Sequence, residues 1–567
     1  MKNFKRIFQT SLLAITLLIA GKGAHAQTIS PIYFGENAWM PDTIGNASDC
    51  QEPPCILYGK LHKNWDKIQD SKASVIRYGG IAADRNMPTK FQYIRMIDSI
   101  RAHGMEPIIQ VPFHNWRYSA AQAAEIVNYI NVVKGKNIKY WIIANEPDLG
   151  YGFTTDNQIA NYFRPFSSAM KAVDPSIKII GPEIASYNSS IISGLTNPGG
   201  PDDITGKDAA GRYYIDIITF HTYPFNGSQT RAQVITKLTG ANQFEQNLIH
   251  LNGKVSAANT HHGRTGANKL KTAVTEANIN WKNSASDNVN GVGANSFIGG
   301  QFVAEMLGLG LKHNVETINI WSVIEGNTTE LNIGFIDPTT GNKKSTYHHF
   351  KMMAENFKGN YVTSTSNNAN VKIFSSKDAN QISVMIMNQD LNSFNYTVKL
   401  ATGTVTGASP VKMNVDADVS YEHTETIQGE STVMLVFNTS GVLLKKYEYS
   451  LTGHAVANQA PTVTDYIATG VETATTPEDG GDFEMKVFPN PSSGKFTVEL
   501  KKGNSEEKSF QVELYNMLGQ QVISKKSTFY NGKEMLELSE GMAQGAYILQ
   551  VKDGDHKVAT KRIILSK

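Results

Sequence analysis

From about residue 28 to residue 355, short apolar runs typical of β-strands alternate with segments of helical periodicity. Eight runs have the pattern of strands: residues 31–35, 74–78, 107–111, 140–144, 177–181, 215–221, 271–276 and 317–322. The segments between them repeat apolar side chains at the spacing of amphipathic helices, as in residues 93–103, 120–133, 157–173 and 299–313. Eight strand–helix units in about 330 residues have the number and the size of a (β/α)8 barrel.

An open, doubly wound sheet is the main alternative to a closed barrel. Such a sheet would usually carry a glycine-rich phosphate-binding turn after its first strand, and residues 34–39, Phe-Gly-Glu-Asn-Ala-Trp, contain no such turn. We therefore expect an α/β fold in which residues 27–357 form a (β/α)8 TIM barrel, ended by a closing helix over residues 350–357.

The sequence pattern changes after residue 357. Residues 358–450 give short alternating runs separated by Asn, Ser and Gly, which is typical of an all-β sandwich. Residues 451–482 are rich in Thr, Ala, Gly, Pro and acidic residues, and we expect them to form an extracellular linker. Residues 483–567 are again β-rich, which predicts a further all-β domain.

The first 26 residues have the composition of a signal peptide. Lys2, Lys5 and Arg6 form a basic start, residues 12–20 an apolar centre, and Ala24-His25-Ala26 a cleavage site of small residues. We expect cleavage before Gln27, with an uncleaved anchor as the alternative. No later apolar run has the length of a transmembrane helix.

Three phrases in the last 85 residues carry a resemblance to a known family. They are VFPNPSSG at residues 487–494, LYNMLG at 514–519 and GAYILQV at 545–551, followed by the basic pair Lys561-Arg562. Their order and spacing resemble the type A C-terminal sorting domain of the Bacteroidetes type IX secretion system. The resemblance implies an Ig-like β-sandwich, recognition by the type IX machinery, and a secreted or outer-surface location. A carbohydrate-binding β-sandwich is the alternative for this block.

Charge and cysteine content limit the partners and the cofactors. The formal net charge is +2 and no basic stripe is present, so nucleic acid is not an expected partner. The only cysteines are Cys50 and Cys55, and their close spacing in an exported protein predicts a local disulfide. A metal site there would need more ligands than the nearest histidine, His62, and no metal or organic cofactor is expected.

Two of the predicted strands end in a glutamate. The run at residues 140–144 stops at Asn145-Glu146-Pro147, because a proline cannot continue the ladder. The run at residues 271–276 ends in Glu276. In a (β/α)8 barrel both strand ends lie on the catalytic face, and paired carboxylates are the groups that hydrolyse glycosidic bonds. Helix capping by Glu146 is the alternative.

Other predicted strands end in side chains that suit a sugar-binding site. These side chains are Arg77, His114, Trp116, His221, Tyr223 and Trp321. A tyrosine hydroxyl such as Tyr223 would stabilise an ionised Glu276, and Trp321 would offer a flat apolar platform. A polar layer inside the barrel is the alternative for Arg77, a core histidine for His221, and packing against the closing helix for Trp321.

Three further acidic residues follow predicted strands. Glu183 and Glu325 are candidates for contact with a substrate at the barrel rim. Asp84 and its neighbour Arg85 are expected to form a surface ion pair without a functional role.

Residues 28–355 as a whole resemble the retaining (β/α)8 glycoside hydrolases of clan A. That clan carries an Asn-Glu pair after strand four and a nucleophilic Glu after strand seven, which are Asn145-Glu146 and Glu276 here. The resemblance implies that Glu146 is the general acid/base and that Glu276 is the nucleophile. It also implies sugar contacts from Asn145 and Trp321.

Within the clan, Arg77-Tyr-Gly-Gly80 and Asn145-Glu-Pro-Asp148 are similar to families 39, 44, 51 and 79, which also carry a C-terminal β-sandwich. No single family matches the whole length, so the resemblance implies a double displacement on an O-glycosidic bond but no particular sugar, linkage or endo or exo action. A non-catalytic glycan-binding surface protein on a degenerate barrel is the alternative function.

Overall fold

The computed structural model describes the chain in segments. They are residues 27–39, 61–283, 287–325, 331–401, 411–466, 484–490, 492–501, 508–516, 520–538, 542, 545–553 and 556–565. The predicted signal peptide and the cysteine pair Cys50 and Cys55 lie outside these residues.

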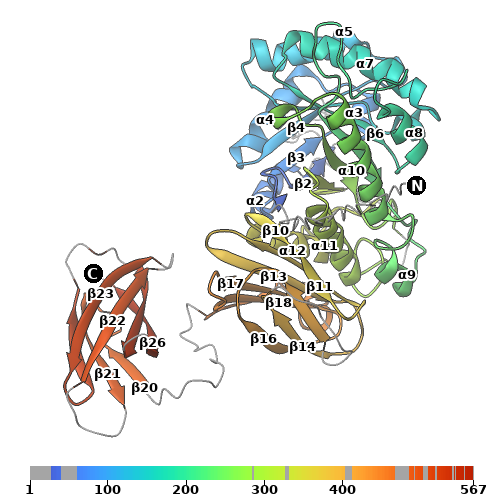
Figure 1. The fold of residues 1–567 in the computed structure, drawn as a ribbon. Coiled ribbons are helices and arrows are strands. Elements are labelled where there is room, and N and C mark those ends of the chain that lie inside the picture. Colours follow the sequence, from blue (N-terminus) through green and yellow to red (C-terminus); the bar gives the residue numbers. More distant parts are fainter. Residues whose placement is uncertain are drawn as a thin grey trace, which may run out of the picture.

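Eight parallel strands close into a barrel, which confirms the predicted fold class (Figure 1). They are β2 (Phe34–Ala38), β3 (Val75–Tyr78), β4 (Glu106–Val111), β5 (Tyr140–Ile143), β6 (Lys178–Ile184), β7 (Ile217–Thr222), β8 (Lys271–Ala277) and β9 (Ile318–Ile320). The barrel closes where Phe34 of β2 pairs with Ile318 of β9. Its interior is filled by apolar side chains from successive strands, such as Val75, Ile108 and Ile142. Each of the eight strands overlaps one of the predicted runs.

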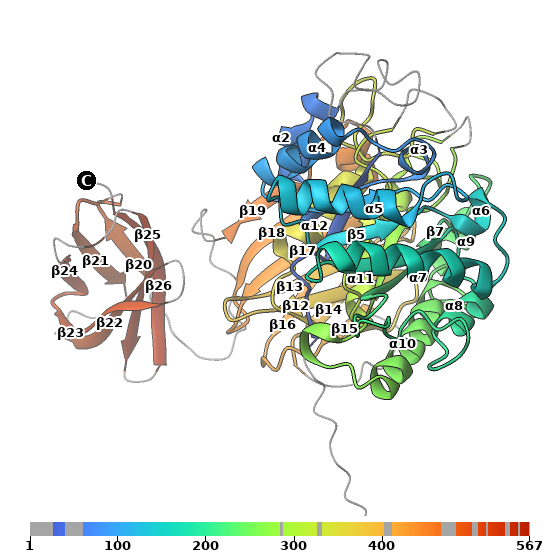
Figure 2. The same ribbon diagram turned by 90° about the horizontal axis from the view of Figure 1, so that it is seen from above.

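Helices surround the barrel, as Figure 2 shows from above. The larger ones are α4 (Lys90–Ala102), α5 (Ala120–Val127), α7 (Asp156–Val173), α10 (Phe244–His261), α11 (Phe297–Lys312) and α12 (Ser345–Asn356). The shorter ones are α2 (Trp65–Asp70), α3 (Ile81–Arg85), α6 (Pro147–Gly150), α8 (Ser189–Leu195) and α9 (Arg231–Thr236). Single 3-10 turns form η2 (Leu61–Lys63) and η4 (Gly266–Asn268), and a π-helical segment, η3 (Asn128–Val133), continues α5. Capping boxes begin several of them: the side chains of Thr89 and Ser119 accept hydrogen bonds from the backbone at the starts of α4 and α5.

The second domain is a sandwich of two sheets. One sheet has the order β1-β10-β12-β13-β17-β18-β19 and the other β11-β15-β14-β16. The strands of the first sheet are β1 (Gln27–Thr28), β10 (Asn360–Val362), β12 (Val371–Lys377), β13 (Gln381–Asn388), β17 (Ser431–Asn438), β18 (Leu443–Ser450) and β19 (Thr462–Asp465). Those of the second are β11 (Ser364–Ser366), β14 (Phe394–Lys399), β15 (Val411–Val415) and β16 (Glu422–Ile427).

The sandwich differs from the expected domain boundaries at both ends. Gln27 and Thr28 of β1 pair with β10, so they belong to the sandwich and not to the barrel. Residues 451–465, expected as linker, form the turn η5 (Leu451–Ala455) and strand β19, which pairs with β18. Their polar composition suits an edge strand, which buries few large apolar side chains.

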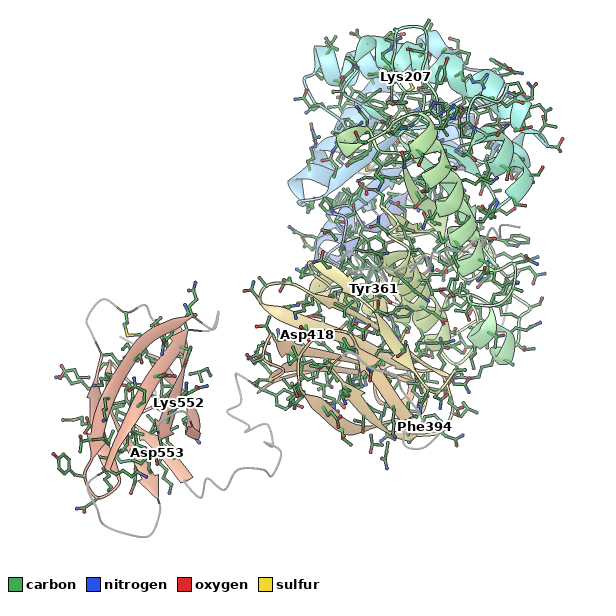
Figure 3. The ribbon with its side chains drawn as sticks, viewed as in Figure 1. Lys207, Tyr361, Phe394, Asp418, Lys552 and Asp553 are labelled. Carbon is green, nitrogen blue, oxygen red and sulfur yellow. The ribbon has the colours of Figure 1, made fainter. Side chains whose placement is uncertain are left out.

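The barrel helices and one face of the sandwich share an apolar cluster, whereas the interior of the sandwich has a cluster of its own. Helix α11 is buried along almost its whole length, and Phe374 and Met434 of the sandwich belong to the same apolar cluster as the barrel helices. Tyr361 of β10 packs against this cluster where the two domains meet (Figure 3). Polar contacts cross the same boundary, including a 3.0 Å hydrogen bond from Nε2 of Gln301 to the carbonyl oxygen of Ser431.

The C-terminal block folds around a core of its own. Its two sheets have the orders β20-β21-β24 and β23-β22-β25-β26. The strands are β20 (Glu484–Phe488), β21 (Lys495–Lys501), β22 (Lys508–Asn516), β23 (Gln521–Phe529), β24 (Lys533–Glu537), β25 (Gly545–Asp553) and β26 (His556–Leu565). This agrees with the predicted β-sandwich. Across the described part of the chain, the structure contains no helix that is long and apolar enough to cross a membrane.

Candidate active site

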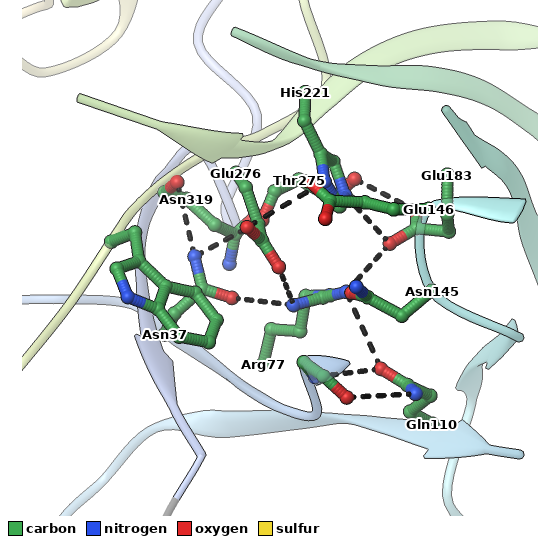
Figure 4. A network of polar contacts seen from close by, with 12 residues as sticks. Asn37, Arg77, Gln110, Asn145, Glu146, Glu183, His221, Thr275, Glu276 and Asn319 are labelled. Carbon is green, nitrogen blue, oxygen red and sulfur yellow. Dashed lines mark hydrogen bonds and ion pairs between the residues drawn. The ribbon is translucent and has the colours of Figure 1, made fainter. Parts of the chain in front are cut away.

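A buried polar network lies at the carboxyl ends of the barrel strands, with Arg77 of β3 at its centre (Figure 4). Nη1 of Arg77 donates to Oε1 of Glu276 at 2.9 Å and to Oδ1 of Asn37 at 3.0 Å. Nη2 donates at 2.8 Å both to Oδ1 of Asn145 and to Oε2 of Glu183. One fully buried guanidinium therefore joins side chains from four other parts of the barrel rim.

Glu276, near the end of β8, accepts two hydrogen bonds and lies beside the cationic His221. Besides Arg77, the hydroxyl of Tyr223 donates to Oε2 at 2.8 Å, and Nδ1 of His221 lies 3.5 Å from the same oxygen. Burial raises the pKa of Glu276 above its ordinary value, although the charges of His221 and Arg77 act in the opposite direction. Burial also raises the pKa of Tyr223 well above its usual range, so this hydroxyl keeps the proton that it donates.

Glu146 lies beyond the end of β5, where the chain turns into α6 at Pro147. Its backbone has a left-handed conformation (φ 47°), and its N–H donates to the carbonyl oxygen of Glu183 at 2.9 Å. Oε1 of Glu146 accepts a 2.9 Å hydrogen bond from Nδ1 of His221. The Glu146 side chain is 15% exposed and that of Glu276 6%, so Glu146 is the more open of the two carboxylates.

His221 of β7 lies between these carboxylates. Nδ1 faces Glu146 and Glu276, and Nε2 donates to Oε2 of Glu183 at 3.1 Å. Burial alone would lower the pKa of His221, but the three carboxylates raise it to about 10. The imidazole is therefore a cation at neutral pH, with both N–H groups engaged.

Glu183 of β6 does not lie where the sequence predicted it. It is completely buried beneath the rim, and is not exposed there to a substrate. Its Oε2 accepts from Arg77 and His221, and its Oε1 accepts a 2.7 Å hydrogen bond from Oγ1 of Thr275. Burial raises the pKa of Glu183, but Arg77 and His221 outweigh this and hold it below its ordinary value.

Trp321 lies at the rim, after β9, and belongs to a second group of contacts. Its Nε1 donates to Oε1 of Glu325, whose Oε2 accepts a 3.1 Å hydrogen bond from Nε1 of Trp39. One carboxylate thus fixes two indoles, and Glu325 is itself buried. The Trp321 ring lies against Gly80, where a Cβ atom would come within 2.5 Å of Cη2.

His114 and Trp116 lie in the loop after β4 and are not part of the Arg77 network. Three consecutive residues of this loop, from His114 to Trp116, have positive φ angles, and the Trp116 side chain is 58% exposed. Asp84 anchors the loop by accepting a 3.1 Å hydrogen bond from the N–H of Phe113. The expected surface position of Asp84 is wrong: the residue is fully buried, and burial raises its pKa to about 7.

The carboxylates and the histidine are close enough together to hold a metal ion. Glu146, His221 and Glu276 each place one possible ligand atom within 4.8 Å of the other two. However, Nδ1 of His221 is already hydrogen-bonded to Oε1 of Glu146, and Nε2 to Oε2 of Glu183. A metal ion at this place would have to displace the first of these contacts.

Comparison with known families identifies the C-terminal block. Residues 486–566 match the family described as the secretion system C-terminal sorting domain. Comparison with curated proteins gives no match for the chain.

Solved structures of glycoside hydrolases are similar to this chain over about two thirds to three quarters of its length. A Paenibacillus polymyxa xyloglucanase of family 44 shares 14% identity at a TM-score of 0.49, covering 73% of this chain and 97% of its own. A family 44 endoglucanase from Clostridium thermocellum shares 12% identity at a TM-score of 0.46, covering 72% of this chain and 97% of its own. A family 39 β-xylosidase from Caulobacter crescentus shares 15% identity at a TM-score of 0.43, covering 66% of this chain and 81% of its own. Likenesses this low concern the fold of this chain and not its activity.

The sorting domain identifies the export route of the protein. Domains of this family mark proteins that the type IX secretion system exports to the cell surface or beyond. The protein is therefore a cargo of that system, and its barrel works outside the cell.

Proposed function

We propose that this protein is a secreted retaining β-glycoside hydrolase that cleaves O-glycosidic bonds of a polysaccharide or oligosaccharide. The observation that carries the proposal is the spacing of two rim carboxylates: an oxygen of Glu146 lies within 4.8 Å of an oxygen of Glu276. Retaining enzymes hold the two carboxyl groups about 5–5.5 Å apart, whereas inverting enzymes need roughly 6.5–9.5 Å to fit a water between them.

The different surroundings of the two glutamates support different roles. Glu276 is bound by Arg77, Tyr223 and His221, which stabilise negative charge and orient the carboxylate for attack on the anomeric carbon. Glu146 is more exposed and accepts one hydrogen bond, from His221, so it can exchange a proton with the leaving group and with water.

The reaction then has two steps. In the first, Glu276 attacks the anomeric carbon while Glu146 gives its proton to the departing glycosidic oxygen, and a glycosyl ester forms on Glu276. In the second, Glu146 removes a proton from water, the water attacks the anomeric carbon, and the ester bond to Glu276 breaks. In this mechanism Asn145, which accepts a hydrogen bond from Arg77, binds the sugar 2-hydroxyl, and Trp321 packs against the sugar ring.

Substitution of the two glutamates tests the proposal. After a screen on plant and algal polysaccharides has found a substrate, we expect Glu276→Ala to lower kcat by roughly 10⁴-fold or more. We expect Glu146→Ala to lower it by roughly 10²–10⁴-fold, and least on aryl glycosides whose leaving group needs no proton. Glu125→Ala, which removes an exposed glutamate of α5, is the matched control and should keep wild-type activity.

Azide distinguishes the two roles. Added azide should restore turnover of Glu276→Ala with an inverted glycosyl azide, and of Glu146→Ala with a retained one. Near-normal hydrolysis by folded Glu276→Ala would remove the proposed nucleophile. Retention of glycans by wild-type protein without release of reducing sugar would instead favour a non-catalytic glycan-binding protein.

A further inference from the structure

Glu183 connects both proposed catalytic residues without touching the space where a substrate would bind. On one side its Oε2 accepts from Arg77 at 2.8 Å, and Arg77 holds Glu276 at 2.9 Å. On the other side the same oxygen accepts from His221 at 3.1 Å, and His221 holds Glu146 at 2.9 Å. A single carboxylate oxygen is thus linked to the proposed nucleophile through one side chain, Arg77, and to the proposed acid/base through another, His221.

Two further hydrogen bonds connect Glu183 to the two proposed catalytic residues through the backbone or a neighbour in the sequence. Oε1 of Glu183 accepts a hydrogen bond from Thr275, the residue before Glu276. The backbone carbonyl of Glu183 accepts the N–H of Glu146, which has a left-handed conformation that needs outside support. Every oxygen atom of Glu183 therefore accepts a hydrogen bond from Glu146 itself, from the residue before Glu276, or from a side chain that contacts one of these two glutamates.

We propose that Glu183 is a positioning residue, which fixes the nucleophile through Arg77 and Thr275 and the acid/base through His221 and its own carbonyl. The proposal rests on the retaining glycosidase function proposed above. Glu183 is not a second acid or nucleophile, because the side chain is completely buried and both carboxylate oxygens are engaged.

The charge of Glu183 also sets the charge balance of the site. Arg77 and His221 are cations, and Glu146, Glu183 and Glu276 are the carboxylates that face them. Without the charge on Glu183, His221 would lose its proton more easily. His221 faces both Glu146 and Glu276, so the loss of its positive charge weakens the hold on both carboxylates. Activity then ends at a lower pH on the alkaline side.

The variant Glu183→Gln isolates this charge. A glutamine amide can keep the oxygen that accepts from Arg77 and His221 and turn its NH2 group toward Oγ1 of Thr275. Thr275 can then donate to Oγ1 of Thr219, which lies 2.7 Å away. Glu36→Gln is the matched control: Glu36 is also a buried barrel glutamate, its carboxylate has no hydrogen-bond partner among the described residues, and burial raises its pKa well above the ordinary value. Its replacement alters a buried carboxyl that makes no hydrogen bond with Glu146 or Glu276.

The pH dependence of kcat/KM on the best substrate of the wild-type protein is the first measurement. We expect Glu183→Gln to lower kcat by roughly 100-fold with KM changed less than about threefold, because the reacting groups shift while substrate contacts stay. The alkaline limb should move to lower pH by about one unit. Glu183→Asp keeps the charge and shortens the reach, so it should lower kcat and leave the alkaline limb in place. Glu36→Gln should match wild type in both.

Histidine NMR gives a readout that needs no hydrolysis. The measurement uses full-length protein labelled with ¹⁵N-histidine, and the His221→Asn variant assigns the His221 signal. In the wild-type protein the His221 imidazole should stay protonated to about pH 10. In Glu183→Gln it should lose its proton at a lower pH. Wild-type kinetics and an unchanged His221 titration in folded Glu183→Gln would overturn the proposal. A wild-type protein that hydrolyses no glycoside would refute the proposed function, while the NMR titration would still test the coupling.

Discussion

The hydroxyl of Tyr223 is the one neutral donor to the nucleophile among the contacts described above. It donates at 2.8 Å to Oε2 of Glu276 and so favours the ionised carboxylate. We expect Tyr223→Phe to raise the pKa of Glu276 further, because the other donors remain and the burial is unchanged. The carboxylate is ionised only above its pKa, so the acid limb of the kcat/KM profile should move to higher pH. We also expect kcat/KM to fall by roughly 10- to 100-fold, from the loss of one hydrogen bond to a charged group.

The measurement is a pH series of kcat/KM with thermal unfolding as a check on the fold. Tyr129→Phe, on the π-helical segment η3, serves as the control and should leave the profile unchanged. An acid limb that stays in place in Tyr223→Phe would show that this hydroxyl does not stabilise the charge on Glu276.

At the scale of elements, the turn from β3 into α3 depends on a glycine. Gly80 has φ +103°, and an added Cβ atom would lie 2.5 Å from the Trp321 ring. We expect Gly80→Ala to displace this indole and to raise KM severalfold. The strained backbone conformation should lower the free energy of unfolding by about 1–3 kcal/mol, and the clash with the indole should lower it further. Gly104→Ala separates the two causes, since Gly104 also has a positive φ (+78°) but no described atom lies within 4 Å of the added Cβ.

Urea unfolding and steady-state kinetics measure both effects. The control should lose about 1–2 kcal/mol and keep its KM. Equal KM values for the two variants would mean that the Trp321 position does not affect substrate binding.

Strand order and strand ends were predictable, because buried parallel strands are apolar runs that end at polar residues. From this pattern the sequence predicts one shared rim for five side chains: Arg77, Asn145, Glu146, His221 and Glu276. In the structure all five lie in one network of polar contacts. Their catalytic roles stay predictions.

The position of Glu183 was not predictable from the same logic. Gly181, two residues earlier on β6, has its Cβ direction toward Phe163 of the helix layer, and strict alternation would point Glu183 the same way. The register of β6 against β7 shifts between Gly181 and Ile184, and Glu183 has φ 61°. This irregularity turns the carboxylate into the barrel, as bulges at barrel rims commonly do. Pro182 was the one available signal, since proline favours bulges within sheets.

At the scale of the whole molecule, we expect the barrel and the sandwich to fold as one unit. Helix α11 has its residues from Phe297 to Leu311 buried, and both barrel and sandwich cover it. We expect a chain that ends after Phe357 to be unfolded or aggregated, because it would expose this apolar surface. A chain that ends after Tyr466 keeps both domains and should unfold in a single transition near the wild-type temperature, with full hydrolytic activity.

Calorimetry and activity of the two truncated proteins check this expectation. In cells, the chain that ends after Tyr466 should remain unsecreted, because it lacks the sorting domain. A soluble, active chain that ends after Phe357 would show that the sandwich is an independent accessory domain.

The short strand β1 has a consequence for the order in which the protein folds. Gln27 and Thr28 precede the whole barrel, yet they pair with Tyr361 and Asn360 in the sandwich. The whole barrel lies between these two segments in the sequence. Pairing between such distant segments is slow, since the entropy of closing the loop is lost before any contact forms. We therefore expect β1 to join its sheet late, after the folded barrel has brought the two segments together.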